Sequence, residues 1–103
     1  DVWVIEHTPG LAIWAKVFVP TASIICCDAM NVDYGKWDLI YGYWPIADRV
    51  RMNQLLLHIK QTMHSKALAA FAFTPDSATS RKLNAVEKHS ILWFAGKHQK
   101  GLK

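Results

Sequence analysis

Residues 37–44 form an apolar segment with titratable side chains, Trp-Asp-Leu-Ile-Tyr-Gly-Tyr-Trp. Asp38, Tyr41 and Tyr43 could pass protons to or from a reacting group, because carboxylates and phenols serve as general acids and bases. The surrounding aromatic and aliphatic residues predict a β-strand that Pro45 ends. The alternative is that the tyrosine rings pack in or near the core and form hydrogen bonds at its edge.

Two arginines follow this segment at the start of a predicted helix. Apolar residues recur there at spacings of three and four: Met52, Leu55, Leu56, Ile59 and Met63. This period predicts a helix over residues 46–65. Arg49 and Arg51 lie near its start, where the helix dipole attracts anions, so they are candidates for anion binding. The alternative is that they are exposed side chains without a specific role.

The histidines and cysteines show no metal-ligand pattern. No two of the five histidines are four residues apart, and His58 and His64, six apart, point to different faces of a helix. We therefore expect no metal site. Cys26 and Cys27 are adjacent, a spacing that rarely meets disulfide geometry, so we expect two reduced thiols in a strand.

Basic residues concentrate in the C-terminal quarter of this small basic protein. Residues 81–103 hold six Lys or Arg against Glu87 alone, whereas the first 80 residues hold six basic and seven acidic residues. Such a patch attracts nucleic acid, an acidic partner or a phosphate-rich cofactor. The alternative is a solvated face. The candidate patch residues are Arg81, Lys82, Lys88, Lys97 and Lys100.

The length of 103 residues and the hydrophobic content of 51% predict one domain, residues 1–103. The longest apolar runs are far shorter than the roughly 20 residues that cross a bilayer, so we expect no membrane segment. The chain opens with Asp1 and Glu6 rather than a basic stretch, which is not typical of a secretory signal. We expect an intracellular, cytoplasmic protein.

Residues 1–36 predict antiparallel strands. Strands are expected over residues 2–6, 11–19 and 23–29, with a loop over residues 31–36. Thr8, Pro9 and Gly10 have the composition of a turn that reverses the chain after the first strand. The domain would therefore open with a hairpin.

Residues 37–103 predict a β-α-β-α-β arrangement with a basic tail. The continuous apolar run over residues 67–73 predicts a strand buried on both faces, in the middle of a sheet. Thr74, Pro75 and Asp76 predict the start of a second helix that runs to Lys88 or His89. A last strand is expected over residues 91–95. The short connections imply right-handed crossovers, at least one parallel pair and a mixed sheet of the α/β (α+β) class.

The stretch from Trp37 to Phe94 resembles the later half of the acetyl-CoA-dependent N-acetyltransferase superfamily, the GCN5-related or acyl-CoA N-acyltransferase fold. The parallels are the strand over residues 38–44 with Pro45, the helix with Leu55 and Leu56, the strand over residues 68–73, and Glu87-Lys88-His89-Ser90-Ile91. In that family the strands on either side of the first of these helices splay apart and create the acyl-CoA cleft.

The resemblance implies transfer of an acetyl group from acetyl-CoA to an amine. Tyr41, Tyr43 and Asp38 would then be the catalytic groups that move protons. The cofactor would bind at the helix start, at Arg49, Val50, Arg51, Met52 and Asn53.

The sequence departs from this family at functional positions. The family cradles the cofactor pyrophosphate in a glycine-rich turn, whereas residues 48–53 contain no glycine. A tyrosine that serves as general acid in the family corresponds to Val86, and an asparagine corresponds to Thr79. The open alternatives are a divergent enzyme, one that has lost catalysis, and a non-catalytic structural or binding protein, such as a viral or assembly component or a nucleic-acid binder.

Overall fold

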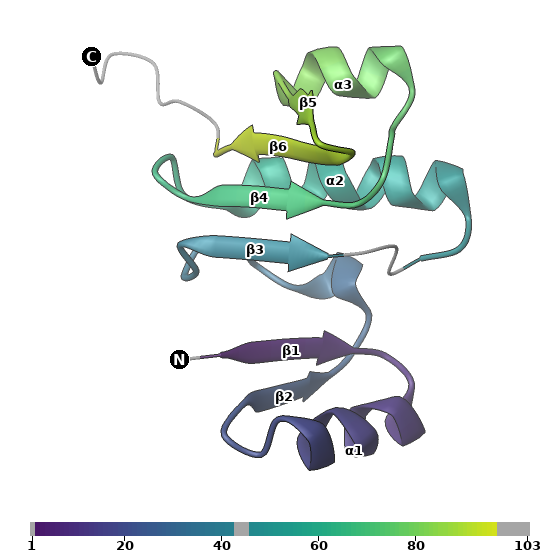
Figure 1. Cartoon of the computed structure of the whole chain (residues 1–103), viewed down its shortest axis with the longest axis vertical. Coiled ribbons are helices and arrows are strands. Elements are labelled where there is room, and N and C mark those ends of the chain that lie inside the picture. The colour runs from purple at the N-terminus through teal and green to yellow at the C-terminus, as the bar shows by residue number, and fades with distance from the viewer. Residues whose placement is uncertain (1, 43–45, 97–103) are drawn as a thin grey trace. The chain divides into compact units, whose positions relative to one another are not determined.

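The computed structural model describes residues 2–42 and 46–96 (Figure 1). Contacts divide the chain into two compact units, Asp1–Val32 and Asp33–Lys103, which we call the N-terminal and C-terminal units. Both combine helices with strands, so the predicted α/β class is confirmed. Among the described residues, no helix is long and apolar enough to cross a membrane. The predicted polar tail beyond Gly96 lies outside the described residues.

The N-terminal unit is a strand-helix-strand arrangement. β1 (Trp3–Glu6) leads into α1 (Pro9–Phe18), and β2 (Ser23–Cys26) returns parallel to β1. A short 3-10 helix, η1 (Ala29–Asn31), follows. The predicted antiparallel hairpin is therefore wrong, because the first two strands of the chain run in the same direction.

The predicted strand over residues 11–19 is instead most of α1. Its apolar run lacks polar alternation, and period alone does not separate such a run from a buried helix. Pro9 occupies the first helical position, where an amide would have no partner within the helix. The Ala12 amide donates to the Thr8 carbonyl at 3.0 Å, which closes the first turn. The residues that seemed to form a reversing turn therefore form a helix start.

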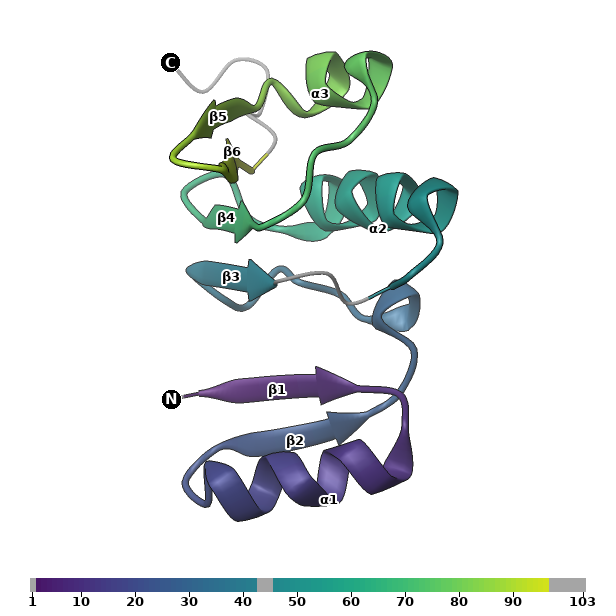
Figure 2. The same ribbon diagram turned by 45° about the vertical axis from the view of Figure 1, so that its right-hand side comes forward.

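The C-terminal unit holds one mixed sheet and two helices. Its elements are β3 (Leu39–Gly42), α2 (Arg49–Thr62), β4 (Leu68–Phe71), α3 (Ser77–Leu83), β5 (Val86–Lys88) and β6 (Ile91–Ala95). The strand order is β3-β4-β6-β5, with β3 parallel to β4 and β6 antiparallel to both neighbours. The predicted first helix, interior strand, last strand and parallel pair are confirmed. Figure 2 shows α2 and α3 on one side of these strands.

The buried stripe of α2 forms much of the core of this unit. Met52, Leu55, Leu56 and Ile59 are at most 1% exposed, as the spacing of apolar residues predicted. On the sheet, Ile40, Ala69 and Phe94 form one buried row across three strands. Burial of each leucine or isoleucine side chain stabilises the fold by about 1.5–3 kcal/mol. The register of β3 and β4 is therefore tied to the packing of α2.

α3 is shorter than the predicted second helix. The Thr79 amide donates to Asp76 Oδ1 at 2.7 Å, so Asp76 rather than Thr74 caps its start. Asn84, with φ of 53°, adopts the left-handed conformation that ends the helix after Leu83. The predicted extension to Lys88 is wrong, and Val86, matched above to a helical tyrosine, lies in β5.

Gly96 lies against the backbone that leads from α2 to β4. Its amide donates to the Ala67 carbonyl at 3.3 Å, and a Cβ at this position would overlap the His64 carbonyl. Because backbone cannot move aside cheaply, we expect Gly96→Ala to lower the free energy of unfolding by about 2–3 kcal/mol in urea denaturation.

Gly10→Ala is the matched control, because a Cβ at Gly10 meets nothing within 4 Å and the residue lies in α1. Alanine favours helices over glycine, so this change should leave stability unchanged or raise it by up to about 1 kcal/mol. Equal losses in both variants would contradict the packing argument.

Candidate functional site

Two carboxylates follow the strands of the N-terminal unit. Glu6 is the last residue of β1 and lies opposite Cys26, the last residue of β2. Asp28 comes two residues after β2, at the start of η1. Because β1 and β2 are parallel, their carboxyl ends meet at one edge, where α1 also begins. Glu6, Asp28 and the first turn of α1 therefore share one edge of this unit.

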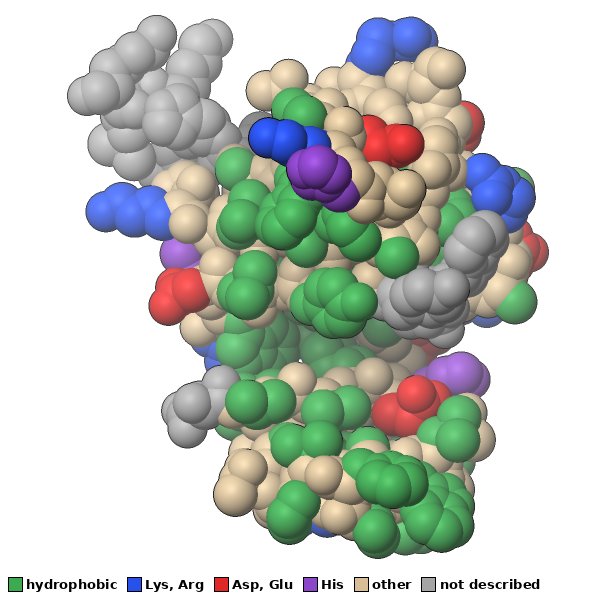
Figure 3. Space-filling model, in the orientation of Figure 1, with side chains coloured by type: hydrophobic (Ala, Val, Ile, Leu, Met, Phe, Trp, Pro, Cys, Tyr) green, Lys and Arg blue, Asp and Glu red, His purple; other side chains and the backbone are tan. Residues whose placement is uncertain are grey.

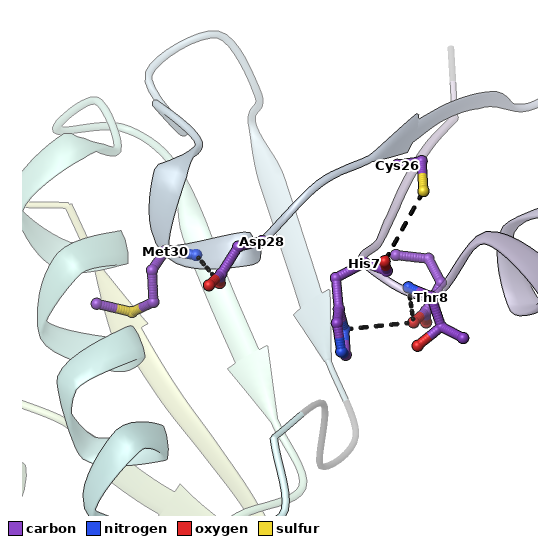
Figure 4. A network of polar contacts seen from close by, with 6 residues as sticks. His7, Thr8, Cys26, Asp28 and Met30 are labelled. Atoms are coloured by element: carbon purple, nitrogen blue, oxygen red, sulfur yellow. Dashed lines mark hydrogen bonds and ion pairs between the residues drawn. The ribbon is translucent and has the colours of Figure 1, made fainter.

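The polar contacts at this edge hold its loops in place (Figure 4). The Thr8 amide donates to Glu6 Oε1 at 3.2 Å, and His7 Nδ1 lies 3.6 Å from the same oxygen. The Met30 amide donates to Asp28 Oδ1 at 2.9 Å. Cys26 Sγ lies 3.9 Å from the His7 carbonyl oxygen, which links the two strand ends. Glu6 and Asp28 are each held by a backbone amide, and Figure 4 shows their contacts as two separate groups.

This edge is acidic, and an apolar surface of the same unit extends to it. Lys16 is the sole Lys or Arg in the first 35 residues, and its Nζ donates to the Ala22 carbonyl at 2.8 Å, just before β2 begins. An open apolar hollow between α1 and β2 is lined by Pro9, Ala12, Ile13, Lys16, Ile24 and Cys26. Pro9 and Cys26 place one end of the hollow at the acidic edge. Together these features suit a ligand with an apolar ring and hydrogen-bond donors or positive charge.

The predicted catalytic residues do not form one cluster among the described residues. Asp38 precedes β3, and its Oδ1 lies 2.8 Å from His64 Nε2. The Lys66 amide donates to His64 Nδ1 at 3.2 Å, so Nε2 carries the hydrogen and donates to Asp38. Tyr41 lies within β3 and is largely exposed, whereas Tyr43 lies outside the described residues. The Asp38–His64 pair was not foreseen, because its partners are 26 residues apart in sequence.

The predicted cofactor residues at the start of α2 already have partners. Asp48 caps the helix, with the Val50 and Arg51 amides donating to its Oδ1 at 2.8 and 3.2 Å. Arg49 donates to the Thr74 carbonyl at 2.7 Å, and its Cζ lies 5.0 Å from the centre of the Phe73 ring. A carboxylate therefore occupies the amides that would cradle a phosphate.

The last two predicted cofactor residues point into the fold. Met52 is fully buried in the core. Asn53 Nδ2 donates to Asp76 Oδ2 at 3.0 Å, and Asn53 Oδ1 is buried without a hydrogen-bond partner. Asn53 therefore links the first turns of α2 to the cap of α3.

β3 and β4 stay paired along their whole length. The register runs from Leu39 opposite Leu68 to Gly42 opposite Phe71, and the Ala72 amide donates to the Gly42 carbonyl at 3.1 Å. The splay that would open an acyl-CoA cleft is therefore absent over residues 39–42 and 68–71.

The basic patch is only partly within the described residues. Arg81 and Lys82 lie in the last turn of α3, where positive charge is favoured by the helix dipole, and Lys88 ends β5. Lys97 and Lys100 lie outside the described residues. In the part of the chain that the structure describes, no three His, Cys, Asp or Glu side chains gather as a metal site.

No protein-family model and no curated protein matches this chain. The acidic edge of the N-terminal unit and the contacts at the start of α2 are therefore the features that bear on function.

Asp76 provides a pH-dependent link between α2 and α3. The hydrogen bond from the Thr79 amide holds the pKa of the Asp76 carboxyl below its ordinary value of 3.8. A lowered pKa in the folded state stabilises the fold above pH 3.8, and this contribution is lost as the pH falls through the lowered value. We expect Asp76→Ala to lower the melting temperature by several degrees at pH 7, with a smaller difference below pH 3.8.

Asp76→Asn is the control, because asparagine keeps the capping oxygen without a titrating group. It should retain most of the stability at pH 7 and melt with a weaker pH dependence. If the Asp76→Ala deficit were the same at pH 7 and at pH 3, the charged cap would not be its cause.

Proposed function

We propose that the acidic edge of the N-terminal unit binds a nucleoside cofactor that carries positive charge and no phosphate, and that the protein is a methyltransferase that uses S-adenosylmethionine. The observation that carries this proposal is the pair of carboxylates, Glu6 and Asp28, at the carboxyl ends of two parallel strands joined by a helix.

The position of Asp28 favours a ribose. Open α/β sheets bind ligands beyond the carboxyl ends of their strands. In strand-helix-strand units, an acidic residue about 20 residues beyond the first turn accepts hydrogen bonds from ribose hydroxyls. Asp28 follows the second strand and lies 18 residues after Gly10. The apolar hollow beside β2 suits the base of the same nucleoside.

A pyrophosphate suits this edge poorly. Dinucleotide sites offer glycines and backbone amides at the helix start, whereas Gly10 is the only glycine in this turn and the Thr8 amide donates to Glu6. Glu6 would also repel a phosphate. Two like charges 4 Å apart cost about 1 kcal/mol in water and about 4 kcal/mol near a protein surface. The same carboxylates attract a sulfonium or an ammonium group.

S-adenosylmethionine combines a base, a ribose, a sulfonium and an amino-acid end whose ammonium and carboxylate charges cancel, so its net charge is positive. In methyl transfer, a lone pair of the acceptor bonds to the methyl carbon, and the electrons of the broken carbon–sulfur bond return to sulfur. The acceptor then loses a proton, and neutral S-adenosylhomocysteine leaves. Glu6 and Asp28 would bind and orient the cofactor; neither forms a bond to the methyl group.

Acetyl transfer from acetyl-CoA to an amine is the second candidate. Its support is the placement of Arg49 and Arg51 at the start of a helix that follows a parallel strand. It is the weaker candidate because Asp48 accepts from the helix-start amides and because β3 and β4 remain paired. Nucleic-acid binding through Arg81, Lys82 and Lys88, and a non-catalytic role in assembly, stay predictions.

Isothermal titration calorimetry on the whole chain separates these functions. S-adenosylmethionine and S-adenosylhomocysteine should bind, and acetyl-CoA and NAD should bind far more weakly. Asp28→Asn retains an oxygen for the Met30 amide but removes the charge, and it should weaken S-adenosylmethionine binding about tenfold or more. A hydrogen bond to a charged group contributes about 1.5–3 kcal/mol.

Asp33→Asn is the matched control. Asp33 is exposed, and the Gly35 amide donates to its Oδ1 at 2.8 Å, which resembles the local contact of Asp28. This variant should bind S-adenosylmethionine as the parent does. Heat with acetyl-CoA and none with S-adenosylmethionine would overturn the proposal in favour of acetyl transfer, and heat with neither would favour a non-catalytic protein.

A further inference from the structure

One face of the sheet in the C-terminal unit is apolar and has no described helix of this unit over it. We call it the outer face, made of two rows of residues across the strands: Leu39, Leu68 and Ala95; and Tyr41, Ala70, Trp93 and Val86. α2 and α3 both lie on the opposite side (Figure 2). Figure 3 shows hydrophobic side chains gathered over the strands of this sheet.

The exposure of the outer face is large for such residues. Leu39, Tyr41 and Val86 are 64%, 68% and 63% exposed, and Leu68 and Trp93 are partly exposed beside them. Strands with one solvated face normally alternate apolar and polar residues, whereas parallel strands are normally covered on both faces. Contiguous apolar patches of this kind mark interaction surfaces. The outer face therefore has the composition of a covered surface.

The shape of the outer face favours a helix as the element that packs on it. Ala70 is small and buried, and it lies between Tyr41 and Trp93 in register, so this row is low at Ala70, between two large aromatic side chains. Helices packed on sheets are the usual second layer of α/β folds. Four strands span about 19 Å at their usual spacing, a width that about 13 helical residues match.

The charge beside the outer face indicates an acidic helix. Lys88 lies opposite Ile91, in the next row on the same face of the sheet, and is exposed. Neither outer row contains an acidic residue. Glu87 belongs to the opposite face of β5, where its Oε1 accepts from the Thr74 hydroxyl. Asp38, just before β3, alternates with Leu39 and so belongs with Ile40 to the opposite face as well. The fixed charge of the described strands on this face is therefore positive.

We propose that the outer face docks an amphipathic helix of a partner polypeptide, with an apolar stripe against Leu39, Tyr41 and Trp93 and acidic residues toward Lys88. The proposal is independent of the cofactor proposed for the N-terminal unit. It accounts for an apolar surface that neither methyl transfer nor acetyl transfer requires.

Fluorescence anisotropy with labelled, designed helical peptides tests the proposal. The probe is an 18-residue peptide, a length that covers the sheet, with leucines at spacings of three and four and glutamates elsewhere. It should bind the whole chain, and Tyr41→Gln should weaken binding about tenfold or more. Lys88→Glu should weaken the glutamate peptide and strengthen a matched peptide whose glutamates are replaced by lysines.

Ile13→Gln is the matched control, because Ile13 is 67% exposed but lies on α1 of the other unit. It should leave peptide binding unchanged, and circular dichroism melts should show that all variants are folded. Equal weakening by Ile13→Gln and Tyr41→Gln would overturn the proposal, as would the absence of binding at 1 mM peptide.

Two further measurements test whether something other than a helix of a partner binds the outer face. Sedimentation that shows a dimer lost in Tyr41→Gln would assign the outer face to a second copy of this chain. Flotation with anionic lipid vesicles that depends on Tyr41 and Lys88 would assign it to a membrane surface. Either result would overturn the helix proposal.

Discussion

Parallel strand pairing is the constraint on which both units depend. Two neighbouring parallel strands cannot be joined by a tight turn, so the chain must cross from the end of one to the start of the next, usually through a helix. α1 makes this crossing between β1 and β2, and α2 makes it between β3 and β4. Each crossing brings two strand ends and one helix start to the same edge. The candidate sites at Glu6 and at Asp48 follow from that geometry.

Acidic residues stand at the start of nearly every helical segment. Asp28, Asp48 and Asp76 each accept a backbone amide at the start of η1, α2 or α3, and Glu6 accepts from Thr8 just before α1. These contacts stabilise helix starts because the first amides have no partner within the helix. The same contacts occupy the backbone amides that would otherwise bind a phosphate at a helix start. A phosphate-free, positively charged ligand therefore suits the N-terminal unit better than a nucleotide.

The sequence predicted a helix or strand correctly where the spacing of the apolar residues and the length of the apolar segment pointed to the same element. α2 carries a clear stripe with spacings of three and four, and β4 is a short apolar run between turn residues. α1 was mistaken for a strand because residues 11–19 are apolar, aromatic or β-branched except for Lys16, a composition that is typical of strands. The end of α3 was missed because Asn84 stops the helix through a left-handed backbone conformation rather than through glycine or proline.

The candidate site was harder to predict than the helices and strands, because its residues come from segments that are far apart in the sequence. Tyr41 and Asp38 both have side chains suited to proton transfer, but residues three apart along a strand point to opposite faces of the sheet. Partners such as His64 come from other elements. Glu6 and Asp28 carry a sequence signal, an acidic residue at the end of the first strand and another just after the second. That signal becomes readable only once residues 9–18 are recognised as a helix, because a hairpin would place the two ends at different edges.

The apolar pattern of β4 bears on the outer face, over which no described helix of the C-terminal unit lies. Its residues, Leu68 to Phe71, lack polar alternation, which predicted a strand buried on both faces. The inner positions, Ala69 and Phe71, are buried on the side of α2. The outer positions, Leu68 and Ala70, share their face with exposed Tyr41 and Leu39. If this face of the sheet were always in water, a polar residue at position 68 would make the protein more soluble. It would cost little packing energy, because Leu68 is partly exposed. Leu68 therefore agrees with a second layer over the outer face, and the described helices of this unit, α2 and α3, both belong to the first layer.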